Sequence, residues 1–320
     1  MTEAQAKAGF LGKRPPWLGP LVALVVVFLI FVAWTPGTSF LATPNLLTMA
    51  RQTVVIAICA LGMTMIIVTG GIDLSTGSLV AFTTVVIAKM LKGGSSPAVA
   101  VMTAVAATTV IGALVGVSVG KLRLMTFVVT LGTMPALRGT AIGLASEQKI
   151  DCDPKGLDRV LEASVSSPGI WVAVVLALVV AGVLGYTRFG RHVFAVGSNE
   201  AAARLCGIDA GNVKIAVYAL ASLLVGVAGV MEFSTLTVGD PTDSVGLELD
   251  VIAAVVIGGA PLAGGEGSIV GSMLGAMLLT VIRTGAVHKG MPSWTQSIVT
   301  GVIIFVAVAL DRARHKRSRT

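Results

Sequence analysis

Charge is scarce in this chain of 320 residues, because only 12% of them are Asp, Glu, Lys or Arg. A typical soluble domain carries about 25%. Hydrophobic residues make up 55%, which is more than a soluble fold of this length could bury. Aromatic residues are also few, at 5%, which argues against a stacking surface for nucleic acids and against the aromatic girdle of a membrane β-barrel. The surplus apolar surface must face lipid, so the sequence predicts an all-α integral membrane protein.

Motifs for catalysis and metal binding are missing as well. The three cysteines and three histidines lie far apart, so they predict neither a disulfide framework nor a metal site. The chain contains no G-x-x-x-x-G-K-[ST] loop, so a nucleotide that drives its work must bind to another protein. A G-x-S-x-G pattern at 116–120 continues a glycine repeat from Gly112, and we interpret it as a close helix contact rather than a hydrolase motif. We expect no enzymatic activity and no cofactor in this chain.

Long uncharged runs predict about ten membrane-spanning helices. The first run, 18–34, follows two basic residues but lacks a cleavage site, so we expect a retained helix. The other uncharged runs lie at 52–72, 74–88, 93–120, 163–187, 215–231, 251–265, 267–282 and 290–310, and one further apolar run, 124–146, is broken only by Arg138. The runs 74–88, 251–265 and 267–282 are short for a span. The expected organisation is a tail at 1–17, a transmembrane domain at 18–311 and a basic tail at 312–320.

The basic residues are unevenly distributed between the connecting segments. An even number of spans puts both termini on one side, and most Lys and Arg residues then fall on that same side, together with the segment 188–212. The acidic stretches 147–162 and 240–248 fall on the other side. Because Lys and Arg favour cytoplasmic loops, we expect both termini to be cytoplasmic and residues 147–162 to be external.

An internal repeat relates residues 68–80 to residues 256–270, and each copy contains a glycine pair between short apolar runs. Paired interruptions in two halves of a transporter favour a substrate path through broken helices. A Gly-Gly pair before Asp or Ser also makes a tight turn and helix cap, which we favour for the individual residues. Arg138 is a further candidate because it lies alone inside an apolar run. The path candidates are Gly70, Gly71, Asp73, Ser75, Arg138, Gly258 and Gly259.

The segment 188–212 is the most specific feature of the predicted cytoplasmic side. Ser198 or Asn199 can cap a short helix through 201–205, and Gly207 can end it. Such a helix can contact a partner protein, or it can lie at the interface as an amphipathic turn without one. The docking candidates are Asn199, Glu200, Ala201, Ala202, Ala203, Arg204, Gly207 and Ile208.

Several sequence blocks resemble the permease subunits of ribose/xylose-type ABC sugar importers, in the binding-protein-dependent permease superfamily. They are G-M-T at 62–64 leading to T-G-G-I-D-L-S at 69–75, F-V-V-T-L-G-T at 127–133 with R-G at 138–139, G-x-N-E-x-A-A at 197–203 with G-I at 207–208, and the stretch 248–267. The resemblance covers roughly 45–311. Residues 146–162 depart from it, because a charged stretch replaces a small polar run.

The resemblance implies a multi-pass protein of the bacterial cytoplasmic (inner) membrane that imports a ribose-like monosaccharide. Two permease chains, in a homo- or heterodimer, would form the pore. A cytoplasmic ABC ATPase, often with two fused nucleotide-binding domains, would bind ATP and dock on the loop at 200–208. A periplasmic or lipid-anchored sugar-binding protein would deliver the solute. The alternatives are an ABC permease for branched-chain amino acids or nucleosides, and an ion-coupled secondary carrier, which the scarcity of buried acids disfavours.

Overall fold

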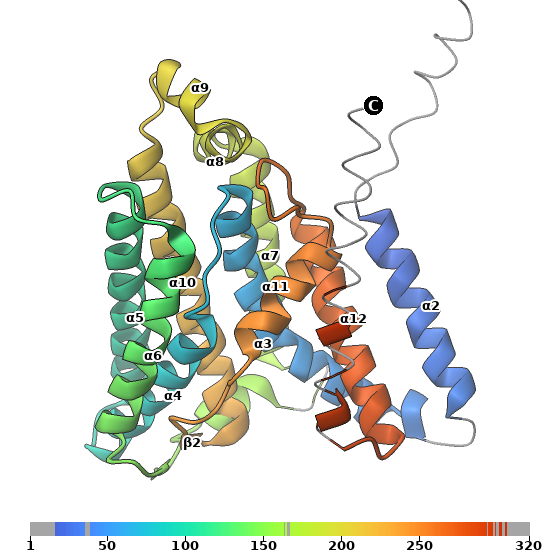
Figure 1. The fold of residues 1–320 in the computed structure, drawn as a ribbon. Helices are drawn as coiled ribbons and strands as arrows, with labels where there is room; N and C mark the ends of the chain where they lie inside the picture. The colour runs from blue at the N-terminus through green and yellow to red at the C-terminus, as the bar shows by residue number, and fades with distance from the viewer. Residues whose placement is uncertain are drawn as a thin grey trace, which may run out of the picture.

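In a computed structural model, the structure describes residues 17–35, 39–162, 164, 167–292, 294–296, 298, 301–302 and 305. This part of the chain is nearly all helical (Figure 1). The long helices are α2 (Leu18–Trp34), α3 (Thr43–Val68), α4 (Thr76–Lys92), α5 (Pro97–Gly120), α6 (Thr126–Leu144), α7 (Pro168–Tyr186), α10 (Ala210–Leu236) and α12 (Ile269–His288). The shorter elements are η1 (Ser39–Leu41), β1 (Ile150–Asp151), η2 (Leu157–Leu161), α8 (Arg188–Ser198), α9 (Glu200–Leu205), β2 (Val238–Gly239) and α11 (Leu247–Ile257).

A helix occupies each of the first nine predicted apolar runs. Six of these helices, α3, α5, α6, α7, α10 and α12, are long and apolar enough to cross a membrane, and α2 is a shorter apolar helix. The predicted run 290–310 lies mostly outside the described residues, as do residues 1–16 and the tail 312–320. The helical membrane fold is therefore confirmed, whereas the number of ten spans is not.

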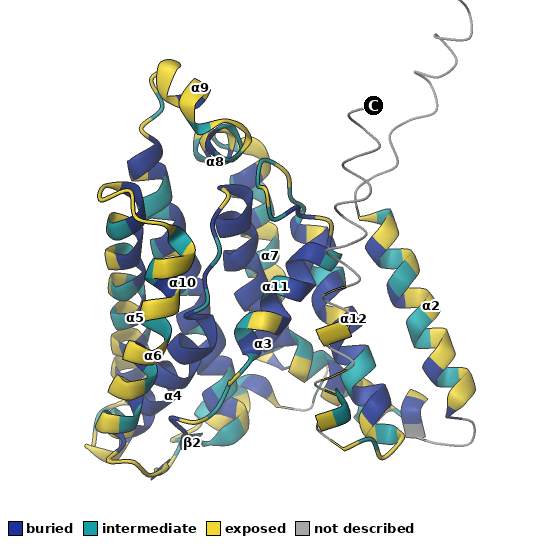
Figure 2. Ribbon diagram, viewed as in Figure 1, coloured by how far each residue is buried: buried dark blue, intermediate teal, exposed yellow. Residues whose placement is uncertain are grey.

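The centre of the molecule is formed by α3 and α10, and the other long helices surround them (Figure 1). Every residue of α3 from Val54 to Val68 is buried. The outer helices α2, α5, α6 and α7 instead expose large apolar side chains, such as Val110, Val128 and Leu178 (Figure 2). Because such surfaces are unfavourable in water, this ring is the expected contact with lipid.

Close packing of α5 against α10 explains the glycine repeat of the sequence. A Cβ atom added at Gly116 would lie 2.7 Å from the Cα of Ile215. One added at Gly112 or Gly120 would overlap Ser222 or Gly211 in the same way. The predicted close helix contact is therefore confirmed, and the G-x-S-x-G pattern lies within a packed helix rather than at a strand-to-helix turn.

The two ends of the helical bundle differ. One end holds α8, α9, the start of α2 and the turn 258–268, and the opposite end holds the strand pair β1–β2 and residues 145–162 (Figure 1). In the strand pair Ile150 lies opposite Gly239 and Asp151 opposite Val238, in antiparallel register. Lys149 reinforces the pair by an ion pair of 2.8 Å to Asp240. This short sheet departs from the all-α prediction, and it arises in the charged stretch that replaces the small polar run.

Helices α4 and α11 both begin inside the molecule. Residues 69–75 are not helical and lead from the end of α3 into α4, and residues 240–246 lead into α11 (Figure 1). The first turn of α4 requires glycine at position 77, because a Cβ atom at Gly77 would overlap Ser244 and Glu248. The amino-terminal ends of α4 and α11 therefore meet in the interior, from opposite directions.

Candidate functional site

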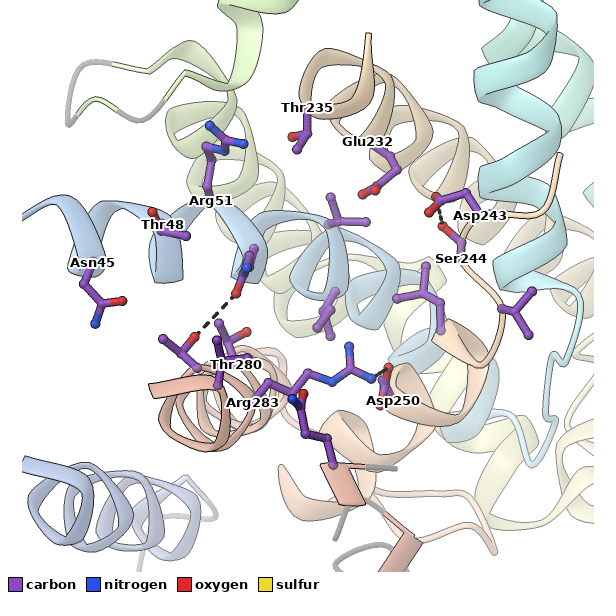
Figure 3. A pocket seen from close by; sticks show the side chains of 18 of the residues that line it. Asn45, Thr48, Arg51, Glu232, Thr235, Asp243, Ser244, Asp250, Thr280 and Arg283 are labelled. Atoms are coloured by element: carbon purple, nitrogen blue, oxygen red, sulfur yellow. Dashed lines mark hydrogen bonds and ion pairs between the residues drawn. The ribbon is translucent and has the colours of Figure 1, made fainter. Parts of the chain in front are cut away.

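A polar cavity of about 540 Å³ lies between α3, α10, α11 and α12 (Figure 3). It belongs to the half of the molecule nearer the β1–β2 end, because it uses the first turns of α3 and the last turns of α10 and α12. Its hydrogen-bonding side chains include neutral and charged groups. They are Asn45, Thr48, Arg51, Gln52, Glu232, Thr235, Asp243, Ser244, Asp250, Thr280, Arg283, Thr284, His288 and Gln296.

Helical periodicity explains why polar side chains gather on facing walls. On α3, Asn45, Thr48 and Gln52 are three and four residues apart, so they share one face of the helix. On α12, Thr280, Thr284 and His288 are each four residues apart, so they also share one face. The two stripes are joined by hydrogen bonds between Thr284 and Gln52, at 3.4 Å, and between His288 and Asn45, at 3.0 Å.

An ion pair closes one side of the cavity. Arg283 on α12 donates a hydrogen bond through Nη2 to Oδ2 of Asp250 on α11. The side chain of Asp250 is only 4% exposed, whereas that of Arg283 is 43% exposed. A buried carboxylate requires such a partner, because an unpaired charge in a medium of low polarity is strongly destabilising. Arg283 thus compensates Asp250 while its own side chain stays partly accessible from the cavity.

Two further charges face the cavity from other walls. Arg51 projects from α3 and Glu232 from α10 (Figure 3). Among the described residues, neither of them forms an ion pair. Asp243 accepts a hydrogen bond of 2.7 Å from the hydroxyl of Ser244. The cavity therefore carries charges of both signs, only some of which are compensated by neighbouring side chains.

Arg138, a predicted path residue, does not line this cavity but fixes one of its walls. Its Nη1 donates hydrogen bonds of 2.8 Å and 2.6 Å to the carbonyl oxygens of Pro241 and Asp243. The side chain therefore crosses from α6 to the segment before α11. Its charge is used to hold a backbone turn, which places the side chains of Asp243 and Ser244 at the cavity.

The predicted glycine pairs lie at the opposite end, near α8 and α9, and they do not line the cavity. Gly70 has a φ of +78° and Gly259 a φ of +93°, backbone conformations that favour glycine. A Cβ atom at Gly71 would lie 2.7 Å from the hydroxyl of Tyr218, and one at Gly258 would lie 2.5 Å from the carbonyl carbon of Gly271. The close contacts and turns thus account for the individual glycines.

The remaining path candidates form the start of α4. Asp73 is buried, and its Oδ1 accepts hydrogen bonds from the backbone N–H of Ser75, at 2.8 Å, and from the Ser75 hydroxyl, at 2.6 Å. This is the geometry of an Asx turn. The simpler interpretation of Asp73, a turn residue at a helix start, agrees with these contacts.

The structure confirms the short helix within the segment 188–212. The side chain of Asn199 accepts a hydrogen bond of 2.9 Å from the backbone N–H of Ala202 and so caps α9. Gly207 follows the helix with a φ of +81°. Helix α8, which precedes α9, is not predicted from the sequence.

Glu200 anchors α9 to the rest of the molecule. It forms an ion pair of 2.6 Å with Arg204, four residues later on the same helix, and another of 2.7 Å with Lys214 on α10. The hydrogen bond from Lys214, together with that from Arg204, lowers the pKa of the Glu200 carboxyl. The carboxylate is therefore held in its charged form.

The three alanines of α9 do not face the same way. Ala203 is buried against the chain itself, whereas Ala201 and Ala202 are exposed. Ala203, one of the predicted docking candidates, therefore needs correction, because its side chain is covered by the chain itself. Leu205 is 90% exposed and Ile208 is half-buried, so an apolar surface continues across the tip of α9.

Residues 45–308 match the protein-family model described as "Branched-chain amino acid transport system / permease component". The chain belongs to this permease family. It is 40% identical to "Ribose import permease protein RbsC" of Escherichia coli (strain K12), over 92% of this chain and 93% of that protein. It is 35% identical to the RbsC protein of Bacillus subtilis (strain 168), over 96% and 94% of the two chains. It is 32% identical to "L-arabinose ABC transporter permease protein AraH" of Azospirillum brasilense, over 92% and 88%. No solved structure matches the chain.

The cavity residues on α11 and α12 are the part of this permease that sequence reasoning missed. Asp250 and Arg283 flank the predicted runs 251–265 and 267–282, so from the sequence alone they resemble charges at the ends of spans. Arg51 and Glu232 likewise flank the predicted runs 52–72 and 215–231. The polar stripe on α3 and the matching stripe on α12 carry the signal that could have identified the cavity.

Proposed function

We propose that this chain is the transmembrane permease subunit of an ATP-driven importer and that it translocates a ribose-like monosaccharide across the bacterial cytoplasmic membrane. The observation that carries the proposal is the similarity over more than nine tenths of the chain to permeases named for ribose import. The relative named for L-arabinose supports the same class of solute. The family model's name makes branched-chain amino acids the second candidate solute.

The energy for transport would come from an ABC ATPase that docks on the tip of α9. Helix α9 is exposed at one end of the molecule, and Lys214 ties it to α10 through Glu200. A push on α9 would therefore be passed to a long central helix. The exposed small side chains of Ala201 and Ala202, next to the exposed Leu205, suit close packing against a partner.

The orientation of the chain and its other partners complete the proposal. The α8–α9 end would face the cytoplasm, as would both termini, and the β1–β2 end with residues 147–162 would face a sugar-binding protein outside. A second permease chain would complete the pore. The Gly70-Gly71 and Gly258-Gly259 segments would interrupt membrane spans in the two halves, which favours a route for the solute between them.

The test of the proposed function compares Ala202→Asp with the matched control Ala202→Ser. A new charge at a packed interface should cost several kcal/mol, enough to dissociate a moderate complex. Ala202→Asp should therefore reach the membrane normally but lose both co-purification with the ATPase and ATP-dependent uptake of D-ribose, whereas Ala202→Ser should keep both. Uptake that persists without any ATPase and follows an ion gradient would instead establish the secondary carrier.

A further inference from the structure

The polar cavity has a composition that neither an apolar nor a singly charged solute would satisfy. Arg51 and Arg283 would attract an anion, but Glu232 and Asp243 would repel it from the facing walls. A cation would meet the reverse arrangement. An apolar solute would displace water from these charged groups without replacing its hydrogen bonds.

A neutral solute with many hydroxyl groups matches the lining better. Each hydroxyl both donates and accepts hydrogen bonds, so one molecule can contact arginine N–H groups and carboxylate oxygens together. Neutral hydroxyl and amide side chains outnumber the charged ones in the lining, and they add further donors and acceptors. A zwitterionic amino acid could pair with the charges but would leave most of these neutral groups without a partner.

Arg283 is the residue most clearly prepared for a ligand. An arginine carries five N–H donors, and within the described part of the chain Arg283 uses one nitrogen, Nη2, in a hydrogen bond to Asp250. The carboxylate anchors this nitrogen of the guanidinium group and is itself nearly inaccessible. Fixed donors lose little freedom when a ligand binds, which favours recognition even where the affinity is modest.

We propose that the cavity between α3, α10, α11 and α12 is the site where the permease holds its solute in transit, and that the ligand is a neutral, polyhydroxylated molecule of monosaccharide size. Its volume of about 540 Å³ lies within the usual range of small-molecule sites. The inference rests on the proposed function, because it assigns the sugar to a place in the chain. In the proposed orientation, the cavity lies on the external side, where the solute arrives.

Direct binding of D-ribose to the purified full-length permease, without ATPase or binding protein, tests the site. Saturation-transfer difference NMR at millimolar ligand detects weak binding, and L-leucine serves as the second probe. Thr48→Trp should fill part of the cavity without touching the ion pair, and it should weaken the binding of ribose about tenfold or more. Thr140→Trp is the matched control, because both threonines are exposed on a helix and donate to the carbonyl oxygen four residues earlier, at 2.9 Å and 2.8 Å.

A second variant separates recognition from a purely structural role of the ion pair and keeps the test valid if Thr48→Trp does not fold. Asp250→Asn combined with Arg283→Gln removes both charges but allows a hydrogen bond between α11 and α12. We expect this double variant to change the ratio of D-ribose to L-arabinose uptake, because the two sugars place their hydroxyl groups differently. If the pair only holds the helices together, uptake of both sugars should fall equally.

The outcomes distinguish the site from the proposed function. Binding of ribose that is lost in Thr48→Trp and kept in Thr140→Trp supports the site. No ribose signal with the wild-type permease, binding of leucine alone, or an equal effect of both tryptophans overturns it. If the site is overturned but the complete transporter still takes up ribose, the proposed function remains supported. If the complete transporter does not take up ribose, the proposed function is refuted.

Discussion

Replacing Gly197 by alanine should separate binding of the ATPase from transport. Gly197 lies near the end of α8, where three backbone segments meet without an intervening side chain. Gly265 donates a backbone hydrogen bond of 2.9 Å to the carbonyl oxygen of Val68. A Cβ atom at Gly197 would overlap that same oxygen and lie 2.8 Å from the nitrogen of Gly265. The end of α8 thus rests directly on the junction of the two repeated glycine segments.

The added methyl group cannot be accommodated by a change of rotamer, because every atom it meets belongs to the backbone. Overpacking of this kind costs about 1–3 kcal/mol, and contact with rigid atoms places it at or above the upper end. Alanine regains up to about 1 kcal/mol of helix propensity. The net loss is therefore small against the stability of a whole protein, and the main effect should be a displacement of α8 from the end of α3 and from the turn at Gly265.

The matched control is Gly185→Ala on α7, since Gly185 is also helical but has no neighbouring atom within 4 Å of an added Cβ. Both variants should co-purify with the ATPase, because the tip of α9 is unchanged. Gly197→Ala should lose most ATP-dependent uptake of D-ribose in membrane vesicles, whereas Gly185→Ala should keep it. Equal uptake by the two variants, at equal amounts in the membrane, would show that transport does not require the contact of α8 with this junction.

Three further predictions concern packing, topology and pH. Gly116→Leu should lower the melting temperature of the permease in detergent, because its Cβ meets the backbone of α10. The control Gly182→Leu, on the open face of α7, should not lower it. Equal melting temperatures of the two variants would contradict the close contact between α5 and α10. In intact cells, a membrane-impermeant thiol reagent should modify Cys152 and not the exposed Cys206. The reaction of Cys152 should be faster at alkaline pH, because burial raises the pKa of its thiol. Labelling of Cys206 before Cys152 would show that the orientation is the reverse of the one proposed. Hydrogen exchange at α9 should be faster in Glu200→Gln than in the wild type at pH 7. Since its cationic neighbours lower the pKa of Glu200, that difference should persist below pH 4.3, about the ordinary glutamate value, and vanish only as the wild-type carboxylate is protonated. No difference at pH 7 would show that the ion pair does not order α9, and a difference already lost at pH 5 would contradict the lowered pKa.

The positions of the helices could be predicted because they depend on local composition. A run of about 20 uncharged residues is set by the thickness of the bilayer, whatever its neighbours are. Helix α8 could not be predicted from the local sequence, because it contains Gly190 and Gly197, which lower its helix propensity. Both glycines are required by tertiary contacts, since a Cβ atom at Gly190 would overlap the backbone of Leu184. Contacts with other helices and turns, at Leu184 for Gly190 and at Val68 and Gly265 for Gly197, thus require residues that the local pattern disfavours.

The polar cavity depends on which helices face each other, and this is the information that a single sequence lacks. Asn45 and His288 are far apart in the chain, and each alone resembles a polar residue at the end of a span. Only the packing of α3 against α12 turns two ordinary stripes into the walls of one site. Arg138 was predicted as functional from its buried charge, and its role in holding the backbone at Asp243 follows only from the tertiary structure.

Helix α11 connects the glycine junction to the cavity. At one end it carries Asp250, which pairs with Arg283 in the cavity wall, and at the other it ends beside Gly258 in the repeated segment. An α-helix of 11 residues is about 16 Å long and does not shorten, so a displacement at the junction cannot be absorbed within it. We infer that movement of α8 reaches the cavity as a movement of Asp250 relative to Arg283. The accessible guanidinium group would then change its position against the solute, which is the physical requirement for a site that must bind and release in turn.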